Sequence, residues 1–135
     1  MTIKQLSIFL ENKTGRINDL TKILGKYGIN MHAFSMAETT DFGILRLIVS
    51  DVERAVEVLR NENFAVMLTD VVCISCPNVA GSLSEILDHL AKNDIFIEYM
   101  YAFAEGDKAN VVIHPNDLDK CVAELSKCQC NINQL

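Results

Sequence analysis

The feature that most constrains the fold of this chain is an internal duplication. When the sequence of 135 residues is shifted by 66 positions, about ten residues become identical without a gap, and the apolar positions agree more closely still. The shift aligns ENKTGRINDL (11–20) with PNVAGSLSEI (77–86), so that Asn12 matches Asn78 and Gly15 matches Gly81. A repeat of this length predicts two copies of one folding unit, which we place at residues 1–70 and 71–135.

The first half reads as strand, helix, strand, strand, helix, strand. QLSIFL predicts a strand, and apolar residues at helical spacing from Arg16 onward predict a helix that ends at a left-handed Gly28. INMHAFSMAE and GILRLIVS predict two strands around the turn TTDFG, and FAVML predicts the fourth strand. Asp51 is expected to cap the second helix, whose apolar stripe begins at Val52.

The second half repeats this order of elements. VVCISC, IFIEYMYAFAE and NVVIH predict strands, Pro115 closes the third of them, and NINQL predicts a weak fourth. The first helix of this half is expected to end at Asn93, and Asp117 is expected to cap the second helix. Ser82 and Glu85 have the spacing of a capping box at the start of the first helix.

The βαββαβ order is that of the ferredoxin-like fold, in which helices cover one face of an antiparallel sheet. We therefore predict an α+β chain of two fused ferredoxin-like domains. The junction FAVMLTDVVCISC contains no Gly-, Pro- or Ser-rich linker, so a flexible tether is not expected. We expect the two halves to pack as one pseudo-symmetric body.

Composition and motifs exclude several classes of function. The net charge of −6 argues against a nucleic-acid groove, which needs clustered Lys and Arg. No stretch approaches the ~20 apolar residues that span a bilayer, and the N-terminus lacks the apolar core of a secretory signal, so a cytoplasmic location is expected. Five cysteines at irregular spacing make a poor disulfide framework. Phosphate-loop and nucleophile motifs are absent, so we expect neither enzymatic activity nor a cofactor.

The repeated corner between strand and helix suits a zwitterionic ligand. A Gly lets the backbone approach a ligand closely, and the first turn of the following helix leaves N–H groups that favour a carboxylate. Asn12 and Asn78 each offer a hydrogen-bond donor and an acceptor without burying a charge. The same residues also suit a plain turn, with Gly15 and Gly81 as turn glycines and the asparagines in Asx turns.

The corner, the order of elements and the duplication together resemble the ACT domain family. The residues L-E-N-K-T-G-R-I, with Asn30 opening the next strand, and the second copy C-P-N-V-A-G-S-L carry this resemblance. It covers essentially the whole chain, once per half, and implies a stand-alone tandem ACT protein. ACT domains are small-molecule sensing modules that most often bind amino acids, generally between the corner of one domain and the second strand of its neighbour. The resemblance thus implies an amino acid ligand and a separate target enzyme or regulator. A homodimer is expected because helices cover only one face of each sheet, which leaves apolar residues on the other face for a contact.

The same resemblance implies which residues bind the ligand. In the first half they are Asn12, Lys13, Thr14, Gly15, Arg16, Ile17, Asn30 and Met31, and in the second half Asn78, Val79, Ala80, Gly81, Ser82, Leu83, Phe96 and Ile97. The two sites differ, because Asn30 is matched by Phe96, which has no amide. We expect that a single occupied site would use the first corner.

Two other functions remain open from the sequence. Cys73 and Cys76 form the C-x-x-C of a metal-binding or thiol-based ferredoxin-like protein, although residues i and i+3 of a strand point to opposite faces. Cys121, Cys128 and Cys130 fit a metal cluster, but free thiols are the more common state of such residues. The second alternative is a structural interaction subunit with vestigial pockets.

Overall fold

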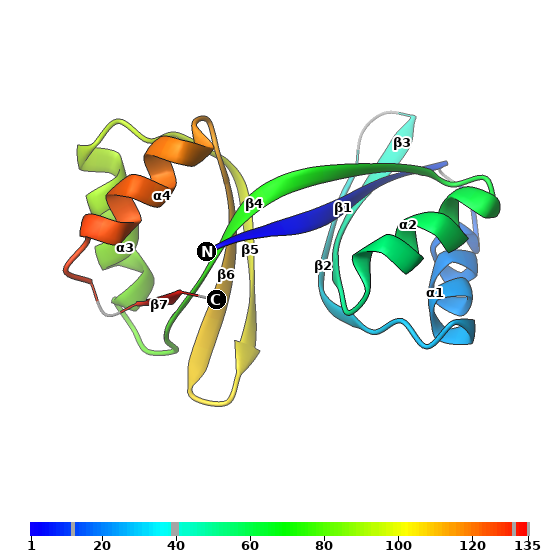
Figure 1. Ribbon diagram of the computed structural model, residues 1–135, viewed down its shortest axis with the longest axis horizontal. Helices are drawn as coiled ribbons and strands as arrows, with labels where there is room; N and C mark the ends of the chain where they lie inside the picture. Colours follow the sequence, from blue (N-terminus) through cyan, green and yellow to red (C-terminus); the bar gives the residue numbers. More distant parts are fainter. Residues whose placement is uncertain (12, 39–40, 131, 135) are drawn as a thin grey trace. The chain divides into compact units, whose positions relative to one another are not determined.

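The computed structural model describes residues 1–11, 13–38, 41–130 and 132–134 (Figure 1). The chain divides into two compact units, which we call the first unit (Lys4–Thr69) and the second unit (Met1–Ile3 with Asp70–Leu135). Met1 groups with the second unit because its carbonyl accepts a hydrogen bond of 2.8 Å from the N–H of Cys73.

The first unit is a ferredoxin-like βαββαβ fold. Its elements are β1 (Thr2–Glu11), α1 (Arg16–Lys26), β2 (Met31–Glu38), β3 (Phe42–Val49), α2 (Val52–Asn61) and the start of β4 (Ala65–Pro77). The strands are ordered β2-β3-β1-β4, so β2 is the outer strand and β3 pairs antiparallel with both of its neighbours. Alternate residues such as Leu6, Leu45 and Leu47 point towards α1 and α2, where they form the core with Leu20 and Leu24.

The second unit has the same fold. It continues with the remainder of β4, then α3 (Ser82–Lys92), β5 (Ile97–Glu105), β6 (Lys108–Pro115), α4 (Leu118–Lys127) and the short β7 (Asn133–Gln134). The strand order is β5-β6-β4, and β7 pairs antiparallel with β4. Figure 1 shows α3 and α4 together on one side of these strands, as expected for two helices on one face. The predicted fold class is therefore confirmed in both halves.

The strand β4 belongs to both units. FAVML and VVCISC, which we predicted as two strands, form one strand of 13 residues. Every residue from Val71 to Cys76 is buried, so both faces of this part of the strand are covered. The absence of a flexible linker at the junction therefore follows from an unbroken strand.

Several predicted helix ends are confirmed and one is wrong. Asp51 and Asp117 cap α2 and α4, because their carboxylates accept hydrogen bonds from the N–H groups of Arg54 and Lys120 at 3.2 and 3.0 Å. Gly28 has the expected positive φ of 68°. The capping box at Ser82 and Glu85 does not form, because Gly81, one residue earlier, is the N-cap of α3. The first helix of the second half ends as predicted, since Asn93 is the C-cap of α3, and the left-handed residue that follows is Asp94, with φ of 56°.

The glycine that caps α1 and the glycine inside it allow a test of how the corner is built. Gly15 has φ of 84°, and a Cβ there would meet nothing within 4 Å, so the cost of Gly15→Ala comes from backbone conformation alone. We expect it to lower the free energy of unfolding by about 1–2 kcal/mol. Gly25→Ala, inside the same helix and equally free of contacts, should instead raise it by about 0.5–1 kcal/mol. Urea unfolding of both variants measures this, and a Gly15→Ala protein as stable as the parent would contradict the prediction.

Candidate functional site

The corner of the first unit carries two opposite charges and a stacked guanidinium. The Nζ of Lys13 lies 2.7 Å from a carboxylate oxygen of Glu11, and both side chains are exposed. This hydrogen bond and the charge of Lys13 lower the pKa of Glu11 below its ordinary value. The guanidinium of Arg16 lies over the ring of Phe64, 4.0 Å from its centroid, rather than extending freely into solvent. Asn12, predicted to bind the ligand, lies outside the described residues.

A cavity opens beside these charges. We call it the corner pocket. It has a volume of about 220 Å³ and is lined by Leu10, Glu11, Lys13, Thr14, Arg16, Ile17 and Met36. Apolar side chains from β1, α1 and β2 line this pocket, and charged side chains from the corner line it as well. The pocket thus combines an apolar interior with both signs of charge.

A second cavity follows α1 away from the corner. We call it the α1–β2 groove. Its volume is about 360 Å³, and it is lined by Ile17, Asn18, Thr21, Met31, Phe34, Leu45 and Leu47. Ile17 lines both cavities, so the groove and the corner pocket adjoin along the same turn of α1.

The predicted residues of the first half are only partly brought together. Lys13, Thr14, Arg16 and Ile17 line the corner pocket, and Met31 lines the α1–β2 groove. Gly15 forms the left-handed turn at the start of α1. Asn30 follows the other end of this 11-residue helix, which is about 16 Å long. The first unit therefore does not bring Asn30 to its own corner.

Asn30 also has a backbone role that recurs in the second unit. Its N–H donates to Ser50 Oγ and its carbonyl accepts from the N–H of Ser50, both at 2.9 Å. At the matching positions the N–H of Phe96 donates to Asn116 Oδ1 at 3.0 Å, and the carbonyl of Phe96 accepts from the N–H of Asn116 at 2.9 Å. Both residues make this pair of hydrogen bonds through their backbone, so the pair does not require an amide side chain at this position.

The corner of the second unit lacks the charges of the first. At the positions of Glu11, Lys13 and Arg16 it has Pro77, Val79 and Ser82. The N–H of Asn78 donates to the carbonyl of Asp107 at 2.9 Å. The other predicted residues of this half lie at the turn (Ala80, Gly81), at the start of α3 (Leu83) and at the start of β5 (Phe96, Ile97). This corner keeps the backbone shape but not the ionic chemistry.

Sequence reasoning missed eight residues that line the two cavities. They are Leu10, Glu11, Asn18, Thr21, Phe34, Met36, Leu45 and Leu47. The alternation in β2 offered one signal, because Phe34 and Met36 share a face and are large apolar side chains that remain 61% and 53% exposed. That this face borders α1 depends on the strand order, which the alternation alone does not specify.

The cysteines of β4 do not form a metal site. Cys76 packs in the helix-covered core with Val72 and Ile74, and Cys73, three residues before it, lies on the opposite face, as predicted. Burial raises the pKa of both thiols. Within the part of the chain that the structure describes, no group of three or more His, Cys, Asp or Glu side chains is placed to hold a metal ion.

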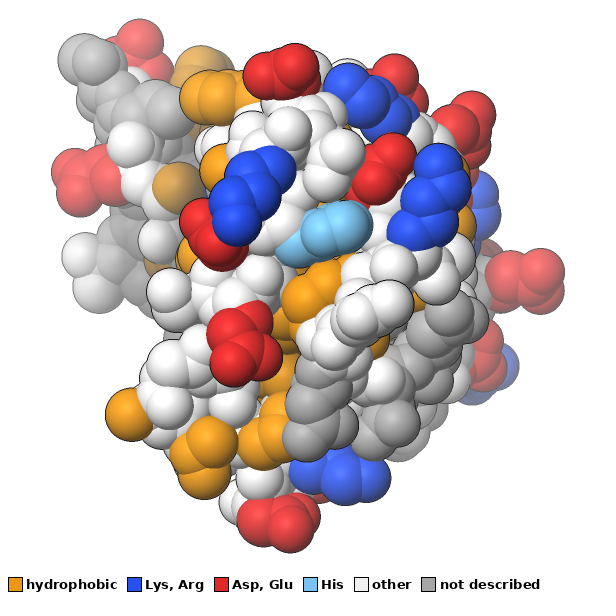
Figure 2. Space-filling view, turned by 90° about the vertical axis from the view of Figure 1, so that its left-hand side faces the viewer, with side chains coloured by type: hydrophobic (Ala, Val, Ile, Leu, Met, Phe, Trp, Pro, Cys, Tyr) orange, Lys and Arg blue, Asp and Glu red, His pale blue; other side chains and the backbone are white. Residues whose placement is uncertain are grey.

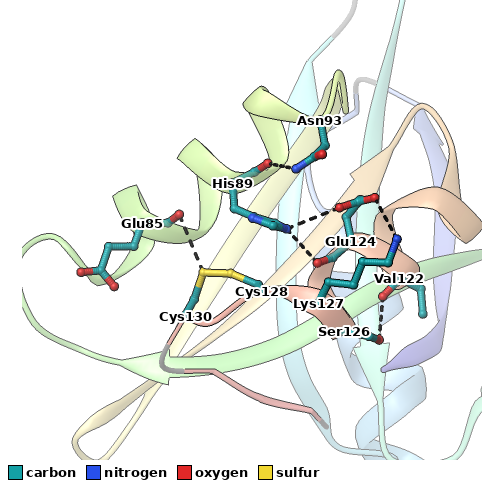
Figure 3. Close-up of polar contacts among 9 residues, drawn as sticks. All are labelled: Glu85, His89, Asn93, Val122, Glu124, Ser126, Lys127, Cys128 and Cys130. Atoms are coloured by element: carbon teal, nitrogen blue, oxygen red, sulfur yellow. Dashed lines mark hydrogen bonds and ion pairs between the residues drawn. A yellow bond between two sulfur atoms is a disulfide. The ribbon is translucent and has the colours of Figure 1, made fainter.

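Of the remaining cysteines, two depart from the expected free thiol and Cys121 agrees with it. Cys128 and Cys130 are joined by a disulfide, so they are not the free thiols expected of them (Figure 3). Cys121 is fully buried in the core, where it is free. Burial, with a smaller effect of Asp117, raises the pKa of Cys121 to about 11.

The disulfide stands beside a polar cluster that ties α3 to α4 (Figure 3). His89 Nε2 lies 2.9 Å from the carbonyl oxygen of Glu124, to which it donates, and 3.6 Å from the carboxylate of the same residue. Lys127 lies 3.6 Å from that carboxylate, and Asn93 donates to the carbonyl of His89 at 2.8 Å. These contacts join two helices and leave His89 with a structural role.

The face of the second unit drawn in Figure 2 has mixed charge. Figure 2 shows acidic and basic side chains interspersed there around a histidine, with a strip of hydrophobic side chains below it. Positive charge is not concentrated among the described side chains visible on this face. In the described residues, no helix is long and apolar enough to cross a membrane.

Two ferredoxin-like units in tandem, each with a left-handed glycine between its first strand and first helix, define a pair of ACT domains. A family model described as an ACT domain pair matches residues 1–129, and the chain belongs to this family. Its members are regulatory domains, which supports a regulatory role for the chain.

Solved structures agree with this assignment. A crystal structure of a protein from Bacteroides thetaiotaomicron is 51% identical, with a TM-score of 0.93 over 99% of this chain and 93% of that one. The ligand-free regulatory subunit of aspartate kinase from Thermus thermophilus is 12% identical, with a TM-score of 0.66 over 96% and 95% of the two chains. The regulatory subunit from Thermus flavus is 14% identical, with a TM-score of 0.63 over 94% of each. These two subunits show the likeness of fold alone. No curated protein sequence matches the chain significantly.

The buried thiol of Cys121 predicts a pH dependence. Because folding raises its pKa from the ordinary 9.0 to about 11, the thiol contributes stability that is present below pH 9. This contribution is lost as the pH rises from 9 to 11, where the unfolded chain releases its proton first. Urea unfolding at several pH values measures this loss, and Cys121→Ala, though less stable throughout, should show a shallower decline. An equal decline in both proteins would contradict the assignment.

Proposed function

We propose that this chain is a regulatory protein that binds an amino acid at the corner of its first unit. Membership of the ACT domain pair family supports the regulatory role. One observation carries the ligand class: Glu11 and Lys13 place a carboxylate and an ammonium group 2.7 Å apart at a pocket that is otherwise largely apolar. A zwitterion presents the same two charges at a similar separation.

The two charges are available for exchange with a ligand. An exposed ion pair contributes little to stability, so replacing one partner by a ligand group costs little. The ammonium group of an amino acid would take the place of Lys13 at Glu11. Its carboxylate would meet Lys13 and the N–H groups at the start of α1, where Gly15 offers no side-chain cap.

Arg16 has a supporting part in this site. Its guanidinium is held over Phe64, which limits its freedom and fixes a positive charge beside the pocket. A positive group held in place loses less conformational entropy on binding than a mobile one. Arg16 therefore favours the carboxylate end of the ligand without a large ordering cost.

The role is regulatory rather than catalytic, and the target is a separate enzyme or regulator. Among the described residues that line the two cavities of the first unit, no nucleophile lies next to a base. A contact of the ligand with the second strand of another domain stays a prediction from the family resemblance, and a homodimer stays a prediction from the sheet face that the helices leave uncovered. The sixteen residues predicted from the sequence are proposed as the wider binding region, with Lys13, Thr14, Arg16 and Ile17 at its centre.

Binding is tested with the full chain, freed of ligand by unfolding and refolding. Each of the twenty amino acids is added at millimolar concentration and the melting temperature is recorded, since a ligand that binds the folded state stabilises it by about 2.7 kcal/mol at a hundredfold excess over Kd. Calorimetry then gives the Kd of the best ligand. The expected result is that at least one amino acid raises the melting temperature.

Variants of the corner locate the site. Glu11→Gln with Lys13→Gln removes both charges and should weaken binding at least about tenfold, because hydrogen bonds to charged groups are among the stronger polar contacts. The matched control is Lys92→Gln, which breaks another exposed ion pair, to Asp88 at 3.0 Å in α3, and should leave the Kd unchanged. The site would be misplaced if the double variant bound as tightly as the parent. The function would be wrong if no amino acid bound at all.

A further inference from the structure

We infer, on the basis of the proposed amino acid binding, that the α1–β2 groove holds the side chain of the ligand and that only the first unit has such a place. The ligand class is an amino acid with a large, uncharged and mainly apolar side chain. Thr21 is the residue that determines this specificity, because its counterpart in the second unit is the larger Leu87.

The groove is an apolar cavity with a fixed floor. Leu45 and Leu47, which line its base, are 1% and 0% exposed and belong to the core of the first unit. Ile17 and Phe34 line it as well but remain 39% and 61% exposed. A ligand that covers this exposed apolar surface is stabilised in the groove, because removing apolar surface from water is favourable.

The polar groups of the groove do not demand a charged ligand. Thr21 Oγ1 donates to the carbonyl of Asn18 at 2.9 Å, so the hydroxyl already has a partner in its own helix. The remaining polar side chain is the amide of Asn18, which is neutral. No residue that lines the groove is charged, and a charged ligand side chain would lose hydration there without a counterion.

The second unit has apolar side chains that pack against its core at the matching positions. The shift of 66 positions places Leu83, Leu87 and Ile97 where the first unit has Ile17, Thr21 and Met31. All three pack against the core of the second unit. In the first unit only Met31 of the three matching residues packs against the core. An added leucine therefore fills from within the space that a ligand would fill in the first unit.

The position of the groove connects it to the corner pocket. Ile17 lines both cavities, so a ligand whose charged groups lie at Glu11 and Lys13 can extend its side chain past Ile17 into the groove. A volume of about 360 Å³ is at the lower end of the range of small-molecule sites. Glycine or alanine would leave most of it empty and would forgo the apolar contacts.

The test compares amino acids and exchanges the two residues. In calorimetry on the full chain, we expect uncharged amino acids the size of leucine, methionine or phenylalanine to bind at least tenfold more tightly than glycine, aspartate or lysine, with one ligand per chain. Thr21→Leu should weaken the binding of the preferred ligand at least tenfold. Thr21→Val keeps the size of the side chain but removes the hydroxyl, and it should bind the ligand as tightly as the parent does. That result would show that the loss of affinity in Thr21→Leu comes from the added volume.

The reciprocal change is the matched control. Leu87→Thr alters the second unit and should leave the Kd of the first site unchanged, while it lowers the melting temperature of the ligand-free protein. Tightest binding of glycine or of a charged amino acid, two equal sites per chain, or unchanged binding in a folded Thr21→Leu variant would each overturn the inference while leaving amino acid binding in place. Binding of no amino acid would overturn the proposed function and the inference together.

Discussion

The left-handed glycine that precedes the first helix is the constraint on which both candidate cavities depend. With φ of 84°, Gly15 is the N-cap of α1, which begins at the next residue, Arg16. This abrupt start sets which residues of α1 meet the sheet, and it places Ile17 at both cavities and Thr21 one turn further along. Gly81 sets α3 in the same way, so Leu83 and Leu87 occupy the matching places. Because the two units have the same backbone at this corner, the side chains determine whether a pocket forms beside the helix.

Much of the fold was predictable because its signals are local or repeated. The duplication supplied each element twice, and Asp51 and Asp117 cap their helices through contacts three residues away. The failures are also local. Ser82 and Glu85 fit a capping box, but a positive φ at Gly81 moves the helix start by one residue, and the spacing rule contains no information about φ.

The candidate site was less predictable, because it is assembled from elements that the sequence keeps apart. Lys13, Thr14, Arg16 and Ile17 follow one another at the corner and could be predicted as a group. Phe34 and Met36 reach the same cavities only because β2 is the outer strand beside β3, which is a property of the strand order. The sequence motif likewise predicted that Asn30 and Gly15 belong to one site, although a helix of 11 residues separates them.

The differences between the units give them unequal dependence on a ligand. Full burial of a leucine side chain stabilises a fold by about 1.5–3 kcal/mol, and Leu87, partly buried against the core, supplies a part of that to the second unit permanently. Thr21 leaves the matching apolar surface of Ile17 and Phe34 partly in contact with water. On the proposed function, the ligand supplies this burial and its contribution rises with ligand concentration. The first unit is then the part of the chain whose stability reports the ligand, and the second unit keeps the same fold at any concentration.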